Sequence, residues 1–275
     1  MIAAAAIVAY ALPYGLRART LSRRGRAVPA WRLWCFAAGI LVLALATSAP
    51  VDELADSRLA AHMAEHLLIA DVASLLLVLG LTGPILAPLL RVRAIDRLRV
   101  LTHPVPAFTI WALNLWLWHL AFAYQGALRH DLVHALQHAC FLLAGMNLWM
   151  PLFGPFPKPR WFGLPAQLGY VIAVRLTGAA LANVFLWSGT VFYSWYGDLE
   201  DQSVAGAVMM VEESITTVAL FGWLFMKWMR EGDERQELEE LAAARGVVLD
   251  PARIARAVAA GRGEELRRRV LAHDA

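Results

Sequence analysis

The chain has 275 residues, of which 59% are hydrophobic and 17% are charged, and eleven of them are tryptophan. This composition excludes a large soluble domain and predicts an integral membrane protein. The formal net charge of +3 indicates no particular partner, and the sequence contains no Gly-rich phosphate loop and no nucleic-acid-reading module.

Seven apolar segments are long enough to cross a bilayer, which takes roughly 20 residues, or somewhat fewer when flanking residues reach the interface. They cover residues 1–16, 31–50, 60–82, 104–124, 131–152, 166–189 and 203–229. The first is short, but it lacks the basic start and the small-residue cleavage site of a signal peptide, so we interpret it as a span. The sequence therefore predicts an all-α fold, a polytopic bundle of seven transmembrane helices over residues 1–230.

The charges between these segments predict how the chain is oriented, because Lys and Arg are retained on the cytoplasmic side of a membrane. Basic residues fill the first, third and fifth loops and follow the seventh segment, whereas acidic residues dominate the second and sixth loops. We therefore expect the N-terminus outside and the C-terminus in the cytoplasm. Residues 231–275 are charged and Ala-rich, with Asp250-Pro251 as a helix start, and predict a cytosolic helical tail.

Five of the eight histidines fall on three of the segments, at one depth beneath the outer face. They are His62 and His66 on the third segment, His119 on the fourth, and His134 and His138 on the fifth. Imidazole is costly to place in hydrocarbon, so such a group is a candidate functional site. Each i,i+4 pair presents both rings on one helix face. The others, His103, His130 and His273, are interpreted as boundary residues that form hydrogen bonds.

The ligand types favour copper. Imidazole with nearby thioether suits copper, particularly Cu(I), and here the thioethers are Met63 on the third segment and Met209 on the seventh. Methionine in a membrane helix is most often a packing residue, so the methionines alone indicate nothing.

Three blocks of sequence resemble the caa-type CtaG family, the multi-span cytochrome c oxidase assembly factors. The similar stretches are His62-Met63-Ala64-Glu65-His66-Leu67-Leu68, the block from His103-Pro104 through Trp118-His119, Tyr124 and His134-Ala135-Leu136-Gln137-His138 to Gly154-Pro155, and Asp201-Gln202 with Gly206 and Met209. The resemblance covers about residues 55 to 215. It concerns the multi-span family and not the single-span copper chaperone that shares its name.

The resemblance implies a seven-span protein of the bacterial plasma membrane that is needed to form active haem-copper oxidase, is not an enzyme and handles copper. Its implied partners are cytochrome c oxidase subunits and other copper carriers, and its oligomeric state is left open. The chain departs from the family at Glu65 and Gln137, where we expect Gln and Glu, and at Glu212-Glu213, where the family has an apolar continuation.

Our leading hypothesis is a Cu(I) site whose ligands are drawn from the five histidines, with Met63 and Met209 as further candidates. Glu65 and Gln137 would orient imidazole rings through the second ring nitrogen. Tyr124 would lie beside the site, and Asp201 would lie at its outer entrance.

A second polar layer is expected at half depth, formed by Asp71, Arg175, Glu212 and Glu213. An unpaired charge at this depth costs several kcal/mol, so Arg175 is expected to pair with one or two of the acids. An interhelical ion pair that fixes packing is the simpler interpretation. The alternative is the floor of a route for copper or for protons released on metal binding.

Two other functions stay open. A b-type cytochrome would need two axial imidazoles from facing helices, which the i,i+4 pairs fit poorly. An intramembrane metalloprotease is the third possibility, because His62 to His66 spells H-x-x-E-H, a pattern that can supply two zinc ligands and a carboxylate base.

Overall fold

A computed structural model describes residues 2–259 and 261–272, with side chains described from residue 7 onward, and His273 lies outside the described residues. Within the described residues all regular structure is helical, as the sequence predicts. By its internal contacts the chain forms two compact units, residues 1–215 and 216–275.

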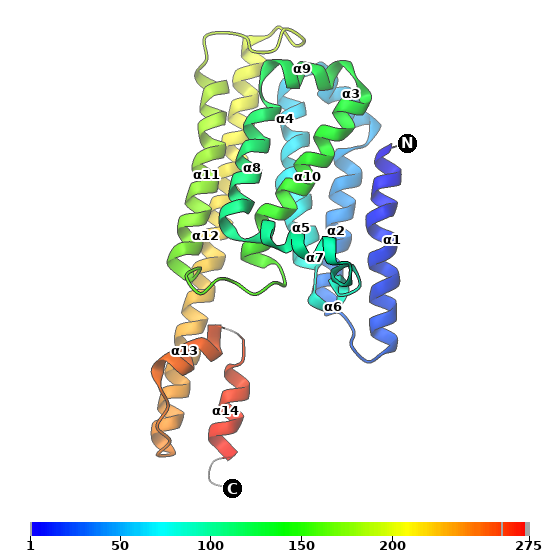
Figure 1. Cartoon of the computed structure of the whole chain (residues 1–275). Helices are drawn as coiled ribbons and strands as arrows, with labels where there is room; N and C mark the ends of the chain where they lie inside the picture. The colour runs from blue at the N-terminus through cyan, green and yellow to red at the C-terminus, as the bar shows by residue number, and fades with distance from the viewer. Residues whose placement is uncertain (1, 260, 273–275) are drawn as a thin grey trace. The chain divides into compact units, whose positions relative to one another are not determined.

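Figure 1 shows the first unit as long helices packed side by side. Its elements are α1 (Ile2–Arg23), α2 (Ala30–Ala46), α3 (Ala49–Ser57), α4 (Leu59–Leu67), α5 (Ser74–Gly80), α6 (Gly83–Leu86), α7 (Arg93–Arg97), α8 (Pro104–Trp118), α9 (Ala121–Arg129), α10 (Asp131–Phe153), α11 (Leu164–Trp187) and the first part of α12 (Leu199–Ala244). A π-helical segment, η1 (Leu68–Ala73), joins α4 to α5, and short 3-10 turns, η2 (Leu89–Arg91) and η3 (Leu98–Thr102), flank α7.

Three continuous helical runs are long and apolar enough to cross a bilayer: Leu59–Gly80, Leu164–Trp187 and Leu199–Ala244. Two bent pairs, α2 with α3 and α8 with α9, satisfy the same criterion when each is counted as one span, which gives three to five candidates in the described part of the chain. The first and fifth predicted segments are also helical, as α1 and α10. However, α1 contains arginines, and the polar residues of α10 lower its mean hydropathy. Seven crossings and their orientation therefore stay predictions.

The fourth predicted segment ends earlier than expected. The helix stops at Trp118 instead of continuing to residue 124, and the chain bends by 71° before α9 begins. Leu120 is extended there, with φ −65° and ψ 136°. The ring of His119 binds the carbonyl oxygen of Leu115 through Nδ1 (2.7 Å), so the side chain satisfies a helix-end carbonyl that the interruption would leave open. His119 therefore lies at a helix end and not within a helix.

Close approach between α10 and the π-helical segment fixes the position of two of the histidines. A Cβ atom built on Gly145 would collide with the backbone carbonyl of Ala70 and with Ser74 Oγ. Small residues allow membrane helices to approach in this way. Because Gly145 lies on the helix that carries His134 and His138, the contact also sets how close these rings come to α4.

Replacing Gly145 with valine is therefore expected to force α10 away from the π-helical segment and to destabilise the protein by about 1–3 kcal/mol, the usual cost of overpacking. Thermal unfolding in detergent measures this loss. Gly169→Ala is the control, because a Cβ atom at this α11 glycine meets nothing within 4 Å. Equal unfolding temperatures for the two variants would contradict the packing argument.

The π-helical segment lies between His66 and Asp71 and changes the direction of the residues that follow it. Its hydrogen bonds reach from i to i+5, so each residue turns the chain less than in an α-helix, and such segments occur mostly at functional sites. Asp71, inside this segment, is only 5% exposed.

The second unit begins at residue 216 and contains the rest of α12, then α13 (Pro251–Ala259) and α14 (Gly263–Leu271). Its apolar core consists of Leu238, Ile254, Val258 and Leu266. Asp250 Oδ1 accepts a hydrogen bond from the backbone N–H of Ala252 (2.9 Å), as the predicted helix start requires. Helix α12 runs without interruption past residue 230, where the sequence predicts the change of domain.

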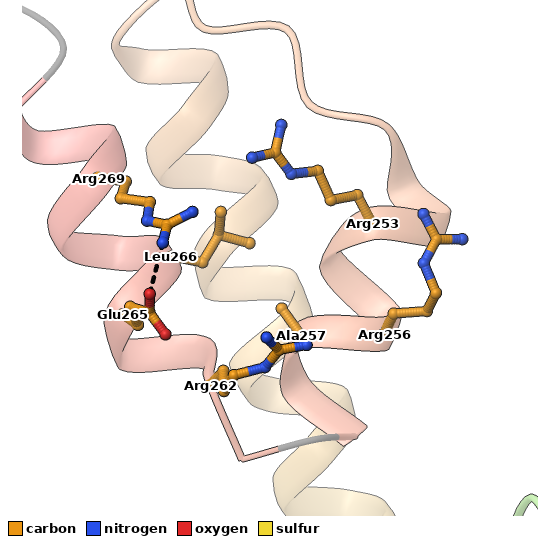
Figure 2. A pocket seen from close by; sticks show the side chains of 7 residues that line it. All are labelled: Arg253, Arg256, Ala257, Arg262, Glu265, Leu266 and Arg269. Carbon is orange, nitrogen blue, oxygen red and sulfur yellow. Dashed lines mark hydrogen bonds and ion pairs between the residues drawn. The ribbon is translucent and has the colours of Figure 1, made fainter.

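Arginines line a pocket of this unit between α13 and α14. Figure 2 shows Arg253, Arg256, Arg262 and Arg269 around Leu266, with Arg269 paired to Glu265. The tail is therefore folded and carries a basic surface.

Candidate metal centre

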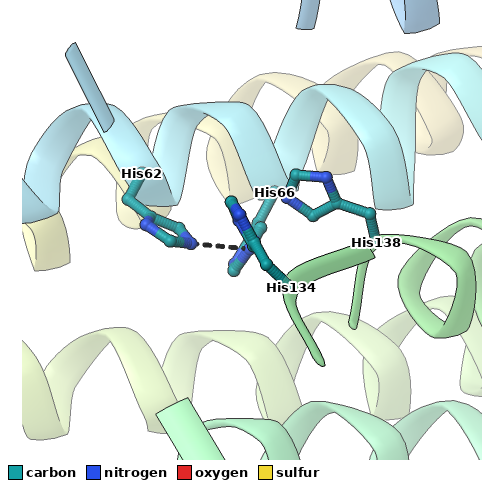
Figure 3. A group of neighbouring side chains, drawn as sticks. All are labelled: His62, His66, His134 and His138. Atoms are coloured by element: carbon teal, nitrogen blue, oxygen red, sulfur yellow. Dashed lines mark hydrogen bonds between the residues drawn. The ribbon is translucent and has the colours of Figure 1, made fainter. Parts of the chain in front are cut away.

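Four of the five predicted histidines meet between α4 and α10. One nitrogen from each of His62, His66, His134 and His138 lies within 4.8 Å of the corresponding nitrogen of the other three. Figure 3 shows the rings turned toward one another from the two helices. The Nε2 atoms of His62 and His66 are 2.9 Å apart. The i,i+4 spacing on each helix is what places two rings on the facing side.

The cluster is buried and its nitrogens are incompletely satisfied. His62 is fully buried and His66 is 4% exposed, and the other two rings are half-buried. Within the described residues, His66 Nδ1, His134 Nε2 and His138 Nε2 are buried atoms without a hydrogen-bond partner. Such groups are rare in folded proteins because each costs about 1–3 kcal/mol. Four imidazoles around one point, with nitrogens free to donate lone pairs, are a fitting donor set for copper or zinc.

Tyr196 orients the ring of His62. The phenol lies in the loop between α11 and α12, and it donates a hydrogen bond to the backbone carbonyl of Ala55 (2.8 Å). Its oxygen lies 2.9 Å from His62 Nδ1, so Nδ1 carries the proton and donates. Burial raises the pKa of Tyr196, which keeps the phenol neutral. The lone pair of His62 Nε2 is then directed at His66, as in metal sites where the second nitrogen of a ligand donates to a fixed acceptor.

His119 lies beside the four-histidine group. Its ring centroid is 6.5 Å from that of His66 and 6.0 Å from that of Tyr124. Nδ1 faces the Leu115 carbonyl and therefore donates, which leaves Nε2 with a lone pair, and this atom is buried without a partner within the described residues. The hydroxyl of Tyr193 donates to the backbone carbonyl of His119 (2.7 Å) and holds this helix end in place.

Glu65 and Gln137 are both fully buried on the helices that carry the cluster. Glu65 Oε1 lies 3.6 Å from His138 Nε2, so the carboxyl group is next to an imidazole but beyond hydrogen-bond distance. Neither carboxylate oxygen of Glu65, nor either amide atom of Gln137, forms a hydrogen bond within the described residues. The expected role in orienting rings fits the position of Glu65, and for both residues it stays a prediction.

Asp201 supports the metal centre through the backbone. From the start of α12, its two carboxylate oxygens accept hydrogen bonds from the N–H groups of Leu59 (2.5 Å) and Ala60 (3.2 Å). These are among the first N–H groups of α4, which have no partner within their own helix. A carboxylate there also interacts favourably with the helix dipole. Asp201 thus fixes the helix end only three residues before His62.

Replacing Asp201 with alanine is expected to destabilise the protein by about 1–2 kcal/mol, the cost of losing a strong helix cap. Copper affinity should fall as well, because the first turn of α4 carries His62. Thermal unfolding and a copper titration measure the two effects. Glu200→Ala, at the exposed neighbouring position, should change neither, and equal behaviour of the two variants would disprove the role of the cap.

Met63 and Met209 lie in an apolar cluster at the edge of the centre. They are 1% and 4% exposed and pack with Tyr124, Phe185 and Tyr193, among others. Tyr124 connects this cluster to the histidines, because its ring lies 5.1 Å from that of His62 and stacks on Tyr193 at 4.0 Å. The methionines thus have a packing role, and their role as soft ligands stays a prediction.

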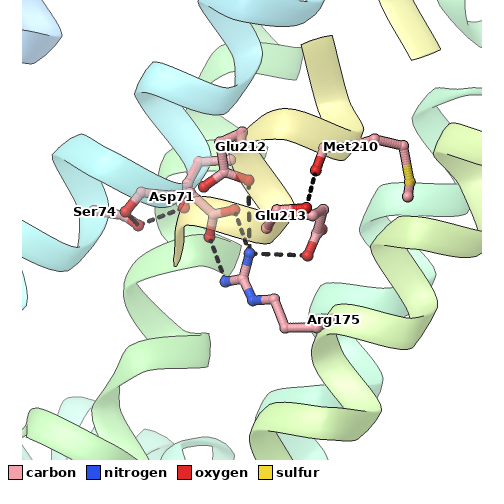
Figure 4. Close-up of polar contacts among 8 residues, drawn as sticks. Asp71, Ser74, Arg175, Met210, Glu212 and Glu213 are labelled. Atoms are coloured by element: carbon pink, nitrogen blue, oxygen red, sulfur yellow. Dashed lines mark hydrogen bonds and ion pairs between the residues drawn. The ribbon is translucent and has the colours of Figure 1, made fainter. Parts of the chain in front are cut away.

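The second polar layer forms around Arg175, as Figure 4 shows. Its guanidinium group donates to both oxygens of Asp71 (3.3 and 3.4 Å) and to Glu213 Oε2 (3.1 Å). Glu212 Oε2 lies 3.6 Å away, and Trp149 stacks beside the charge, 5.3 Å from ring centroid to Arg175 Cζ. The structure therefore brings together all four residues of the expected layer. Its three carboxyl groups come from two helical runs that face α11.

Sequence reasoning missed the tyrosines of the loop between α11 and α12. The aromatic run from Phe192 to Tyr196 was the available signal, but no spacing rule relates a loop residue to a helix more than a hundred positions away. Figure 1 shows why they matter: α3, α9 and this loop lie at the same end of the first unit.

The candidate membrane spans and the group of four imidazoles are compatible with a membrane protein that has a metal-binding donor set. The sequence matches the cytochrome c oxidase caa3 assembly factor family (Caa3_CtaG) over residues 12–231. The chain belongs to this family.

Several mycobacterial proteins are similar. Mb0105 of Mycobacterium bovis and MT0111 of Mycobacterium tuberculosis, both described as uncharacterized, are each 25% identical over 260 residues, which is 84% of this chain and 39% of theirs. The uncharacterized ML1998 of Mycobacterium leprae is 24% identical over 246 residues, 79% of this chain and 37% of its own. The chain thus spans less than two fifths of the length of these relatives. No solved structure matches.

Proposed function

We propose that this protein is a copper-binding assembly factor for haem-copper cytochrome c oxidase, embedded in the bacterial plasma membrane by seven helices with the N-terminus outside. The observation that carries the proposal is the convergence of four imidazoles from α4 and α10 on one buried point. Family membership supports the link to the oxidase. Copper is the cargo, and no covalent bond is made or broken.

His62, His66, His134 and His138 are the proposed ligands of Cu(I). Imidazole nitrogens suit copper, and the tautomer that Tyr196 imposes on His62 leaves a lone pair on the inward nitrogen. His119 offers a further lone pair at Nε2, and its ring centroid lies 6.5 Å from that of His66. Met63 and Met209 are proposed as further, softer ligands.

The proposed recipients are subunits of the oxidase that lack copper, and other copper carriers are the proposed source. The location of the centre supports contact with these partners at the outer end of the protein. The outer loops carry the residues that hold the centre in place, so a partner at that end of the protein would reach it first. The midplane layer around Arg175 is proposed to close the centre from below, and Glu212→Gln with Glu213→Gln tests whether it also conducts copper.

The two alternatives fit the geometry less well. The rings of His134 and His138 have centroids 4.2 Å apart, and those of His62 and His66 are 4.3 Å apart, so the imidazoles contact one another and leave no slot for a porphyrin between them. A zinc protease keeps one coordination position open for water beside three protein ligands. Four imidazoles at one point favour holding an ion over hydrolysis.

Metal analysis tests the proposal. Protein purified in detergent after growth with copper should contain close to one copper per chain, and an anaerobic Cu(I) titration should show a matching tight site. Absence of a Soret band would exclude the haem alternative. Copper-free protein that also fails to bind Cu(I) in the titration would refute the proposed function, and zinc retention with peptide cleavage lost on Glu65→Gln would favour the protease.

A further inference from the structure

A second group of possible ligands lies on the outer side of the four histidines. Asp52, Glu65 and His134 each offer one ligand atom, and these three atoms lie within 4.8 Å of one another. They come from α3, α4 and α10. Asp52 is exposed, His134 is half-buried and Glu65 is fully buried, so the group leads from the surface to the interior.

Two observations distinguish this group from an ordinary patch of acidic residues. Glu65 is 0% exposed, and neither of its oxygens accepts a hydrogen bond within the described residues. An oxygen atom in that position is costly unless a cation or a donor satisfies it. His134 Nε2 is also buried without a partner in the described part of the chain. The group therefore contains buried donor atoms that its own neighbours do not satisfy.

The outer group shares residues with the inner one. His134 belongs to both sets of possible ligands, and Glu65 Oε1 lies 3.6 Å from His138 Nε2. An ion held by Asp52, Glu65 and His134 could therefore reach the four histidines by exchanging one ligand at a time.

We propose that Asp52, Glu65 and His134 form a second cation site, which receives a divalent first-row metal ion at the surface and is coupled to the four-histidine centre through His134. Two carboxylates with one imidazole are a harder ligand set than four imidazoles and favour a divalent ion over Cu(I). Two carboxylates also balance the charge of such an ion. This proposal rests on the proposed function, because it takes copper as the ion that binds. The probe in the experiment is therefore Cu²⁺.

The experiment is a Cu²⁺ titration of the full chain in detergent, followed by electron paramagnetic resonance. Because His134 serves one ion at a time, wild-type protein is expected to bind two ions per chain. One should give a spectrum of several nitrogen ligands from the other three histidines, and one should show the single nitrogen ligand of His134. Asp52→Asn should remove the single-nitrogen signal, or weaken that site at least tenfold, and leave the other. Glu53→Gln, at an exposed neighbouring position of α3, is the matched control and should bind like wild type.

A second variant separates this proposal from the proposed function. His66→Ala with His138→Ala should abolish the signal of several nitrogens and keep the single-nitrogen signal, because neither residue belongs to the outer group. Identical stoichiometry and spectra for wild type and Asp52→Asn would overturn the second site. Wild-type protein that shows the single-nitrogen Cu²⁺ signal but binds no Cu(I) in an anaerobic titration would leave the second site standing and refute the proposed function.

Discussion

Replacing His66 and His138 together with alanine is expected to abolish tight Cu(I) binding and the formation of active oxidase. The two residues supply one ligand from each helix of the four-histidine group. Losing a residue that merely supports a ligand lowers metal affinity about 10–100-fold, so the loss of two ligands should exceed about 100-fold. Anaerobic Cu(I) titration of the purified protein and oxidase activity of membranes measure the two consequences.

The control for this pair is His103→Ala. His103 precedes α8 and lies against Trp161, with ring centroids 5.5 Å apart, so its removal changes the histidine count but not the centre. Circular dichroism should show the same helix content in all variants. A double variant that retains full copper affinity while it remains folded would disprove the assignment of these ligands.

Replacing Arg175 with glutamine is expected to destabilise the bundle by about 3–5 kcal/mol, because removing one partner of a buried ion pair leaves uncompensated charge. Asp71, Arg175 and Glu213 are only 5%, 5% and 7% exposed. The fork of two hydrogen bonds from Arg175 to Asp71 also ties α11 to the π-helical segment. Thermal unfolding in detergent and yield of folded protein measure the loss.

A compensated variant tests whether charge or packing is responsible. Arg175→Gln combined with Asp71→Asn and Glu213→Gln removes the cation together with two of its carboxylates, and it should recover most of the lost stability. Arg160→Gln, at an exposed loop position, should have no effect. Equal instability of the single and compensated variants would show that shape and not charge sets the requirement at this layer.

The sequence allowed the helical class and the gathering of the histidines to be predicted, for a physical reason. Helix direction and the rise per residue fix the depth of each position once the segments are known. The i,i+4 spacing then fixes a common face, so His62, His66, His134 and His138 could be placed in one layer before any contact was known. The pairing of Arg175 followed from the cost of an isolated charge in hydrocarbon.

Other features depend on contacts that no local pattern encodes. The interruption after Trp118 is accompanied by a hydrogen bond from the ring of His119 to a carbonyl of its own helix, which a count of apolar residues cannot reveal. The position of Asp201 beside an entrance stays a prediction, whereas its hydrogen bonds to the backbone at the start of α4 could not be predicted from the sequence. To predict the group of Asp52, Glu65 and His134, one would need to know how α3, α4 and α10 are placed relative to one another. In each case tertiary structure decided the role, and residue type alone did not.

One phenol oxygen joins the loop before α12 to both α3 and the first ligand of the cluster. If a docking protein drew that loop outward, Ala55 and His62 would lose the same atom simultaneously. The imidazole could then rotate about its side-chain bonds, and the lone pair that faces the ion would turn away. Release of a bound ion would in that case need a shift of this short loop and no change in the long helices.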